Sequence, residues 1–201
     1  MFDTSEAFRD ECVEIMERIL KQSTYPSVKM LNIASSKFKD TPSILRLFQA
    51  GNIENLLLDS YNTETMNEIY ELDQWKMAKS VSVGCDISSV TFENYAHLEN
   101  ICVRGGSSNV FPVQLAVEIR DILMKSPNFK NAIFNMPIKN IDVIRVFDPN
   151  LVERRVFTED AIRGKFHCNF HGNNFKVNIE ESKFEIRKEP ISDCPWESNL
   201  F

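Results

Sequence analysis

The segment Val28–Ile33 reads VKMLNI, and its arrangement of apolar residues, apolar-x-x-apolar-x-apolar, decides the fold of this chain. The arrangement returns four times, 25, 25, 20 and 31 residues onward: Ile53–Leu58 (IENLLL), Ala78–Val83 (AKSVSV), Leu98–Val103 (LENICV) and Phe129–Phe134 (FKNAIF). Recurrence at such a period is typical of repeat proteins, because one strand–helix unit cannot bury its own apolar face and must stack on its neighbours. We therefore predict an α/β fold in which the five segments are strands of one parallel sheet.

Helix signals lie between these strands. Thr41-Pro42 begins one helix and Gly51 ends it, which agrees with the preference for proline at the start and glycine at the end of helices. A second helix is expected from Thr63 to about Trp75, and a third over Val113–Lys125, whereas 88–95 has room for only a turn or two. The repeat core is that of a leucine-rich repeat, but the unit lengths vary. We predict an irregular leucine-rich-repeat-like solenoid with helices behind the sheet.

The two ends of the chain differ from the strand–helix repeats, which we assign to 28–136. Apolar residues at helical spacing predict an amphipathic helix over 6–22, which would cap the first repeat. The region 137–190 is predicted to be a C-terminal β cap, because apolar and polar residues alternate from Lys165 onward around turn residues. The whole of 1–190 is expected to be one domain, and 191–201 a flexible tail.

Charge, cysteine content and hydropathy argue against several classes of function. The net charge of −6 and the pI of about 5.2 disfavour nucleic acid as a partner, because its phosphates require a basic patch. The five cysteines contain no C-x-x-C pair, which argues against a disulfide framework and against a zinc ribbon. We find no signal-peptide pattern and no apolar run of about 18 residues, the length that crosses a membrane. The expected location is therefore the cytoplasm or the nucleus, without membrane contact.

Candidate chemistry is sparse. His167 and His171 lie four residues apart on either side of Cys168, but a zinc site requires three or four converging ligands. His97 precedes Cys102, and a structural histidine beside an inert thiol is the favoured interpretation over a catalytic pair. The glycine-containing loop that follows Val103 matches no phosphate-binding motif. We predict no catalytic residue, no metal site and no cofactor.

The residues between the apolar strand positions should point outward across the sheet. Together they make a polar surface with a few apolar side chains embedded in it, a mixture that suits protein recognition. The predicted partner-binding residues are Met30, Asn32, Asn55, Leu57, Asp59, Ser82, Asn100, Arg104, Ile133 and Asn135.

Two stretches resemble the nematode FTH domain, also called DUF38. Glu68–Val81 (EIYELDQWKMAKSV) is similar to the E-I-x-x-L-x-Q-W-K-x-A-K stretch of that family, and Ile119–Phe129 (IRDILMKSPNF) to its L-R-D-x-L-x-K-S-P-N-F helix end. The closing segments Phe175–Ile179 and Phe184–Ile186 also fit. The resemblance covers roughly 8–190.

The resemblance implies a binding role rather than a reaction. FTH domains commonly follow an F-box, which docks onto the Skp1 subunit of a cullin ubiquitin ligase, and the FTH part is thought to select the partner or substrate. No F-box-like opening precedes the first repeat here, which argues against direct docking onto Skp1 by this chain. Two alternatives stay open, namely a stand-alone FTH antagonist or scaffold with no ubiquitin ligase role, and an enzyme with an unrecognised site.

Overall fold

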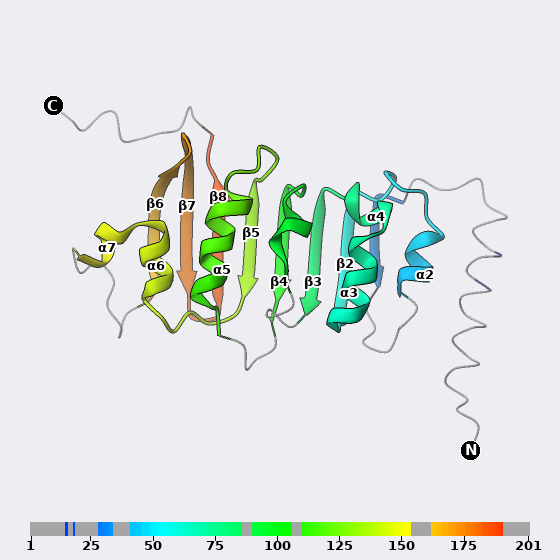
Figure 1. Ribbon diagram of the computed structural model, residues 1–201, viewed down its shortest axis with the longest axis horizontal. Coiled ribbons are helices and arrows are strands. Elements are labelled where there is room, and N and C mark those ends of the chain that lie inside the picture. The colour runs from blue at the N-terminus through cyan, green and yellow to red at the C-terminus, as the bar shows by residue number, and fades with distance from the viewer. Residues whose placement is uncertain are drawn as a thin grey trace, which may run out of the picture.

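The computed structural model describes residues 28–33, 41–85, 90–105, 110–153 and 162–190, together with Ile15 and Arg18. Within these residues eight strands form one sheet in the order β1-β2-β3-β4-β5-β8-β7-β6 (Figure 1). The strands are β1 (Met30–Ile33), β2 (Asn55–Tyr61), β3 (Ser80–Cys85), β4 (Asn100–Arg104), β5 (Asn131–Asn135), β6 (Gly164–Phe170), β7 (Asn173–Glu180) and β8 (Lys183–Lys188). The first five strands are parallel, and β8, β7 and β6 continue the sheet with antiparallel pairing. The fold is α/β with a mixed sheet.

The register of the parallel strands reproduces the sequence repeat. Met30 pairs with Asn55, Asn55 with Ser80, Ser80 with Asn100, and Asn100 with Asn131. These are the same steps of 25, 25, 20 and 31 residues that separate the five apolar segments. Because side chains alternate between the faces of a strand, this register puts the apolar positions of every unit on one face. The predicted parallel pairing of the five segments is confirmed.

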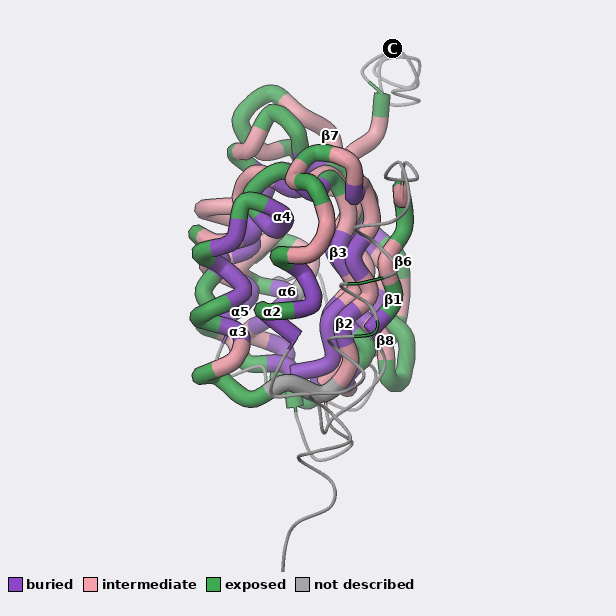
Figure 2. Tube along the Cα trace, turned by 90° about the vertical axis from the view of Figure 1, so that its right-hand side faces the viewer, coloured by how far each residue is buried: buried purple, intermediate pink, exposed green. Residues whose placement is uncertain are grey.

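Helices α2 to α6 cover one face of this sheet, and the views in Figures 1 and 2 agree on this. The described helical segments are α2 (Thr41–Arg46), α3 (Thr63–Tyr70), α4 (Asp73–Lys76), the 3-10 turn η2 (Phe92–Tyr95), α5 (Val113–Glu118), its π-helical continuation η3 (Ile119–Leu123), α6 (Asp142–Phe147) and α7 (Pro149–Glu153). The core lies between the sheet and these helices, where Leu56, Val83, Val103 and Phe134 are fully buried. No helix among the described residues is long and apolar enough to cross a membrane.

The second predicted helix begins and ends close to where the structure has it, but it is interrupted at Leu72. Asn62 rather than Thr63 caps α3, because its Oδ1 accepts a hydrogen bond from the backbone N–H of Thr65 at 2.9 Å. The helix ends at Tyr70, and Leu72 has an extended backbone with ψ of 140°. The single predicted helix is therefore two short ones, α3 and α4, set at an angle that brings both against the core.

The region 137–190 is only partly the predicted β cap. It begins with the two helices α6 and α7, and its strands start at Gly164. From there the expected antiparallel meander is present, with a turn at His171 and Gly172, both of which have positive φ. The meander joins the repeat sheet through pairing of β8 with β5.

The two predicted terminal segments, 6–22 and 191–201, lie largely outside the described residues. Of the helix expected over 6–22, only Ile15 and Arg18 are described, and both are helical. The rest of that segment and the tail 191–201 lie outside the described residues.

Candidate protein-interaction face

The face of the sheet opposite the helices is covered by no helix among the described residues (Figures 1 and 2). In β4 and β5 the residues that point away from the helices are half-buried or exposed and those between them are buried, and β3 follows the same alternation from Ser80 to Val83. We call this surface, where β1 to β5 form it, the open face. The structure places all ten predicted partner-binding residues on it: Met30, Asn32, Asn55, Leu57, Asp59, Ser82, Asn100, Arg104, Ile133 and Asn135. Their role in binding stays a prediction.

One ion pair crosses the open face. Arg104 Nη2 on β4 lies 3.2 Å from Asp59 Oδ1 on β2, so the pair spans β3. The β3 residue that pairs with Arg104 is Gly84, which has no side chain to separate the two charged groups. Arg104 Nε is buried and finds no hydrogen-bond partner among the described residues. An unsatisfied buried donor costs stability, which is expected where a side chain is retained for an interaction rather than for the fold.

Apolar side chains interrupt the polar surface at three places. Met30 is 62% exposed at the edge strand β1. Leu57 and Ile133 are half-buried and lie in one row across the sheet, with Ser82 and Cys102 between them. A few apolar anchors within a polar surround are the composition of a protein-binding surface rather than of a small-molecule pocket.

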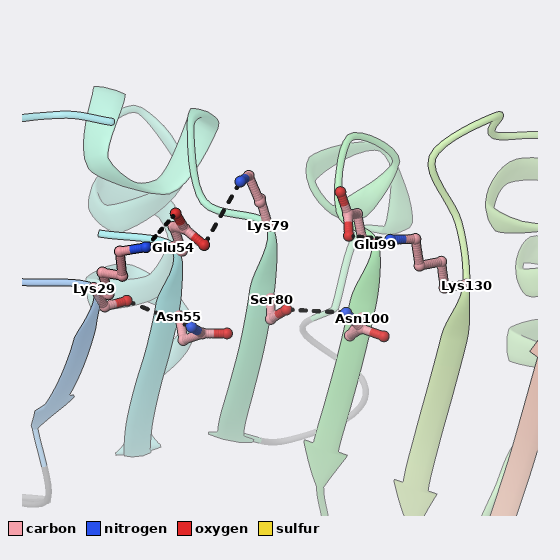
Figure 3. A network of polar contacts seen from close by, with 8 residues as sticks. All are labelled: Lys29, Glu54, Asn55, Lys79, Ser80, Glu99, Asn100 and Lys130. Carbon is pink, nitrogen blue, oxygen red and sulfur yellow. Dashed lines mark hydrogen bonds and ion pairs between the residues drawn. The ribbon is translucent and has the colours of Figure 1, made fainter. Parts of the chain in front are cut away.

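A ladder of alternating charge runs along the edge where the parallel strands begin (Figure 3). Glu54 lies between Lys29 and Lys79, with N–O distances of 3.7 and 3.6 Å, and Lys130 Nζ contacts Glu99 Oε2 at 2.7 Å. We call these five residues the charge ladder. Our sequence analysis missed it, although a signal was present: the second residue of the five repeat segments is Lys, Glu, Lys, Glu and Lys in turn.

The charge ladder is expected to help hold the strands in register. Replacing Glu54 with lysine puts three like charges in a row, and we expect a loss of up to about 1 kcal/mol in the free energy of unfolding, limited by solvent screening. The loss should shrink in 1 M salt, where the Debye length falls to about 3 Å. Urea denaturation at low and high salt measures both effects. Glu68→Lys on the exposed surface of α3 is the matched control, because Glu68 lies outside the first turn of the helix, and an equal loss there would contradict a role for the ladder.

The E-I-x-x-L-x-Q-W-K stretch proves to be a packing motif. Trp75 is 1% exposed, and its Nε1 donates a hydrogen bond to the carbonyl oxygen of Asn94 at 2.9 Å. Gln74, also buried, donates from Nε2 to the carbonyl oxygen of Phe48 at 2.7 Å. His97 Nε2 lies 2.9 Å from the carbonyl oxygen of Trp75. His97 thus has the structural role that the sequence analysis favoured for it. This motif therefore ties α4 to η2 and to the segment that follows α2.

His167 and Cys168 also have structural explanations, whereas residues 106–109 of the glycine-containing loop lie outside the described residues. His167 Nδ1 lies 3.0 Å from Glu189 Oε2. Burial raises the pKa of the Cys168 thiol to about 12, so this cysteine remains a protonated, unreactive thiol at neutral pH. Among the described residues no group of three or more histidine, cysteine, aspartate or glutamate side chains is placed to hold a metal ion.

Comparison with known proteins adds one positive finding. The model of the FTH domain family matches residues 10–150, which is more than half of the chain. No curated protein and no solved structure matches. The matched range contains both sequence stretches that resemble the family and all five parallel strands. The chain therefore belongs to the FTH domain family.

Proposed function

We propose that this chain is a non-catalytic protein-interaction module that binds a partner protein through the open face of its repeat sheet. The observation that carries the proposal is a polar sheet face, free of described helices, that presents a cross-strand ion pair and three apolar side chains. In this proposal the strand–helix units act as a leucine-rich-repeat-like solenoid, which offers its sheet as a continuous surface.

Family membership supports a role in selecting a partner or substrate, as in F-box-associated proteins. A ubiquitin ligase adaptor would recover Skp1 and cullin together with the selected protein, whereas a stand-alone antagonist or scaffold would recover the selected protein alone. We place the protein in the cytoplasm or the nucleus. The raised pKa of the half-buried Cys168 and the packing role of His97 give no support to the enzyme alternative.

The open face is tested by reversing its ion pair. Asp59→Arg combined with Arg104→Asp keeps an intramolecular pair but inverts the charges that a partner meets. We expect the variant to fold and to bind its partner at least about tenfold more weakly, because mismatched charges across an interface are strongly unfavourable. Tagged wild-type and variant proteins are used for affinity purification with quantitative mass spectrometry, and the affinity for the identified partner is then measured by calorimetry.

The matched control reverses an ion pair on the helical side. Asp142 and Arg145 form an exposed pair on α6, and their reversal changes the same charges away from the sheet. This control should retain wild-type affinity. Equal affinity of the Asp59/Arg104 reversal and wild type, with both folded by circular dichroism, would remove the open face as the binding surface.

A further inference from the structure

A second group of charged residues lies over the antiparallel strands, outside the ten predicted residues. A pocket of about 180 Å³ there is lined by Lys165, Lys176, Asn178, Glu185 and Arg187, and we call it the meander pocket. Three of its five lining residues are basic and one is acidic. The region 162–190 carries six lysines and arginines against four glutamates, whereas the whole chain has a net charge of −6. Positive charge is thus concentrated at one end of an acidic molecule.

Strand register explains why these side chains converge. Lys165 on β6 pairs with Asn178 on β7, which pairs with Glu185 on β8. Lys176 and Arg187 form the neighbouring row and lie directly opposite each other. Because residues two apart along a strand share a face, all five side chains lie on the same side of the sheet. β8 pairs with β5, so this side continues the open face.

The one acidic side chain in the pocket is already neutralised. Glu185 Oε2 accepts a hydrogen bond from Lys183 Nζ at 2.8 Å, and its Oε1 accepts one from Arg187 Nη2 at 2.7 Å. Burial raises the pKa of Glu185, but these two cations outweigh it and the pKa is lowered overall. Lys165 and Lys176 are exposed, and the side chain of neither forms an ion pair or hydrogen bond with any residue that the structure describes. Their two positive charges are therefore uncompensated.

The cross-strand pair of Lys176 and Arg187 does not favour folding. Like charges directly opposite each other on neighbouring strands are destabilising. A sheet selected only for stability would place an acidic residue at one of the two positions. A local departure of this kind is expected where the side chains serve an interaction.

We propose that the meander pocket binds an acidic segment of a partner protein, a short peptide stretch whose aspartate or glutamate carboxylates are held by Lys165, Lys176 and Arg187. Carboxylates form short, charge-assisted hydrogen bonds with lysine and arginine, and the pocket volume fits side chains rather than a folded surface. This proposal deepens the proposed function, because one partner can cover the open face and place its acidic segment in the pocket. A long polyanion such as nucleic acid is disfavoured by the net charge of the chain.

Fluorescence anisotropy with the full chain tests the pocket directly. The probes are a labelled ten-residue peptide of aspartate and glutamate and its counterpart with asparagine and glutamine. We expect only the acidic peptide to bind, and Lys165→Gln with Lys176→Gln to weaken it by about tenfold in 0.1 M salt, where exposed charges still interact over roughly 10 Å. The control, Lys125→Gln with Lys139→Gln, removes two exposed lysines elsewhere and should retain affinity.

Folding and binding can be separated in this site. Lys176→Glu puts an acidic residue opposite Arg187, so its melting temperature should equal or exceed that of wild type while acidic-peptide binding is lost. Equal binding by Lys165→Gln/Lys176→Gln, binding of the neutral peptide, or tighter binding of an oligonucleotide of the same length would overturn the proposal. If the acidic peptide fails to bind while the Asp59/Arg104 reversal abolishes partner capture, only the meander pocket is refuted and the open face stands.

Discussion

Replacing Trp75 with alanine is expected to lower the free energy of unfolding by about 3–5 kcal/mol, the usual cost of removing a large aromatic side chain from a packed core. The Trp75 ring centroid lies 5.1 Å from that of Tyr70 and 5.2 Å from that of Tyr95, both in edge-to-face geometry. The substitution also leaves the carbonyl oxygen of Asn94 without the indole donor. Because small domains have a total stability of about 5–15 kcal/mol, this loss removes a large fraction of the stability.

Urea denaturation followed by circular dichroism measures this loss. Trp75→Phe keeps an aromatic ring but loses the hydrogen bond to Asn94, and it should cost roughly 1–3 kcal/mol. Met77 follows α4 and is 56% exposed, so Met77→Ala should stay within about 0.5 kcal/mol of wild type. A loss below about 1 kcal/mol for Trp75→Ala would mean that the core can close over the missing ring, contrary to the packing role assigned to this motif.

The strand–helix repeat could be predicted from the sequence because, in a stacked parallel sheet, the number of residues between two repeats equals the number of residues between two paired strand positions. The 20-residue step from Ser80 to Asn100 predicts the pairing of these two residues whatever the intervening chain does. The same parity of strand positions placed Leu57 and Ile133 on the open face. Local sequence therefore sufficed to place the five parallel strands and to put the ten candidate residues on one face of the sheet.

Helices α6 and α7 could not be read in the same way. The stretch Ile141–Phe147 contains two charged residues, Asp142 and Arg145, among apolar ones, and a segment this short does not distinguish a helix from a strand by periodicity alone. Val143 and Ile144 are both fully buried, but α6 has only six residues, so the helical spacing of its buried positions is not repeated often enough to be recognised. The predicted β cap consequently started too early.

The charge ladder and the meander pocket depend on pairings that the sequence does not state. Glu54 is one charged residue among many until the register sets it between Lys29 and Lys79. The meander pocket requires the register of β6 on β7 and of β7 on β8, which pairs Lys165 with Asn178 and Lys176 with Arg187. Lys165 and Arg187 line one pocket because of that register.

Raising the pH above 10 is expected to destabilise the protein through a second feature of the aromatic cluster. The hydroxyl oxygens of Tyr70 and Tyr95 lie 3.0 Å apart in the core. Burial raises the pKa of Tyr70 from 10.0 to about 12, and burial together with the neighbouring Tyr70 raises that of Tyr95 well above 10.0. Between pH 10 and 12 both tyrosines of the unfolded chain lose protons that the folded chain keeps, so stability falls as pH rises. The expected slope is on the order of 1 kcal/mol per pH unit for each tyrosine.

The double variant Tyr70→Phe/Tyr95→Phe isolates this contribution. All other ionisable groups are the same in the two chains, so the difference between the two urea denaturation series, at pH 8, 9, 10 and 11, reports the tyrosine pair. Removing both hydroxyls takes away both partners of their hydrogen bond, and the double variant should be nearly as stable as wild type at pH 8. Each single variant leaves one hydroxyl without this partner and should be less stable than the double variant, the non-additivity expected of two groups in direct contact. Parallel slopes for wild type and the double variant above pH 10 would mean that both tyrosines ionise as readily in the folded chain as in the unfolded one. That result would contradict the prediction, which rests on the burial of Tyr70 and Tyr95 at 4% and 0% exposure.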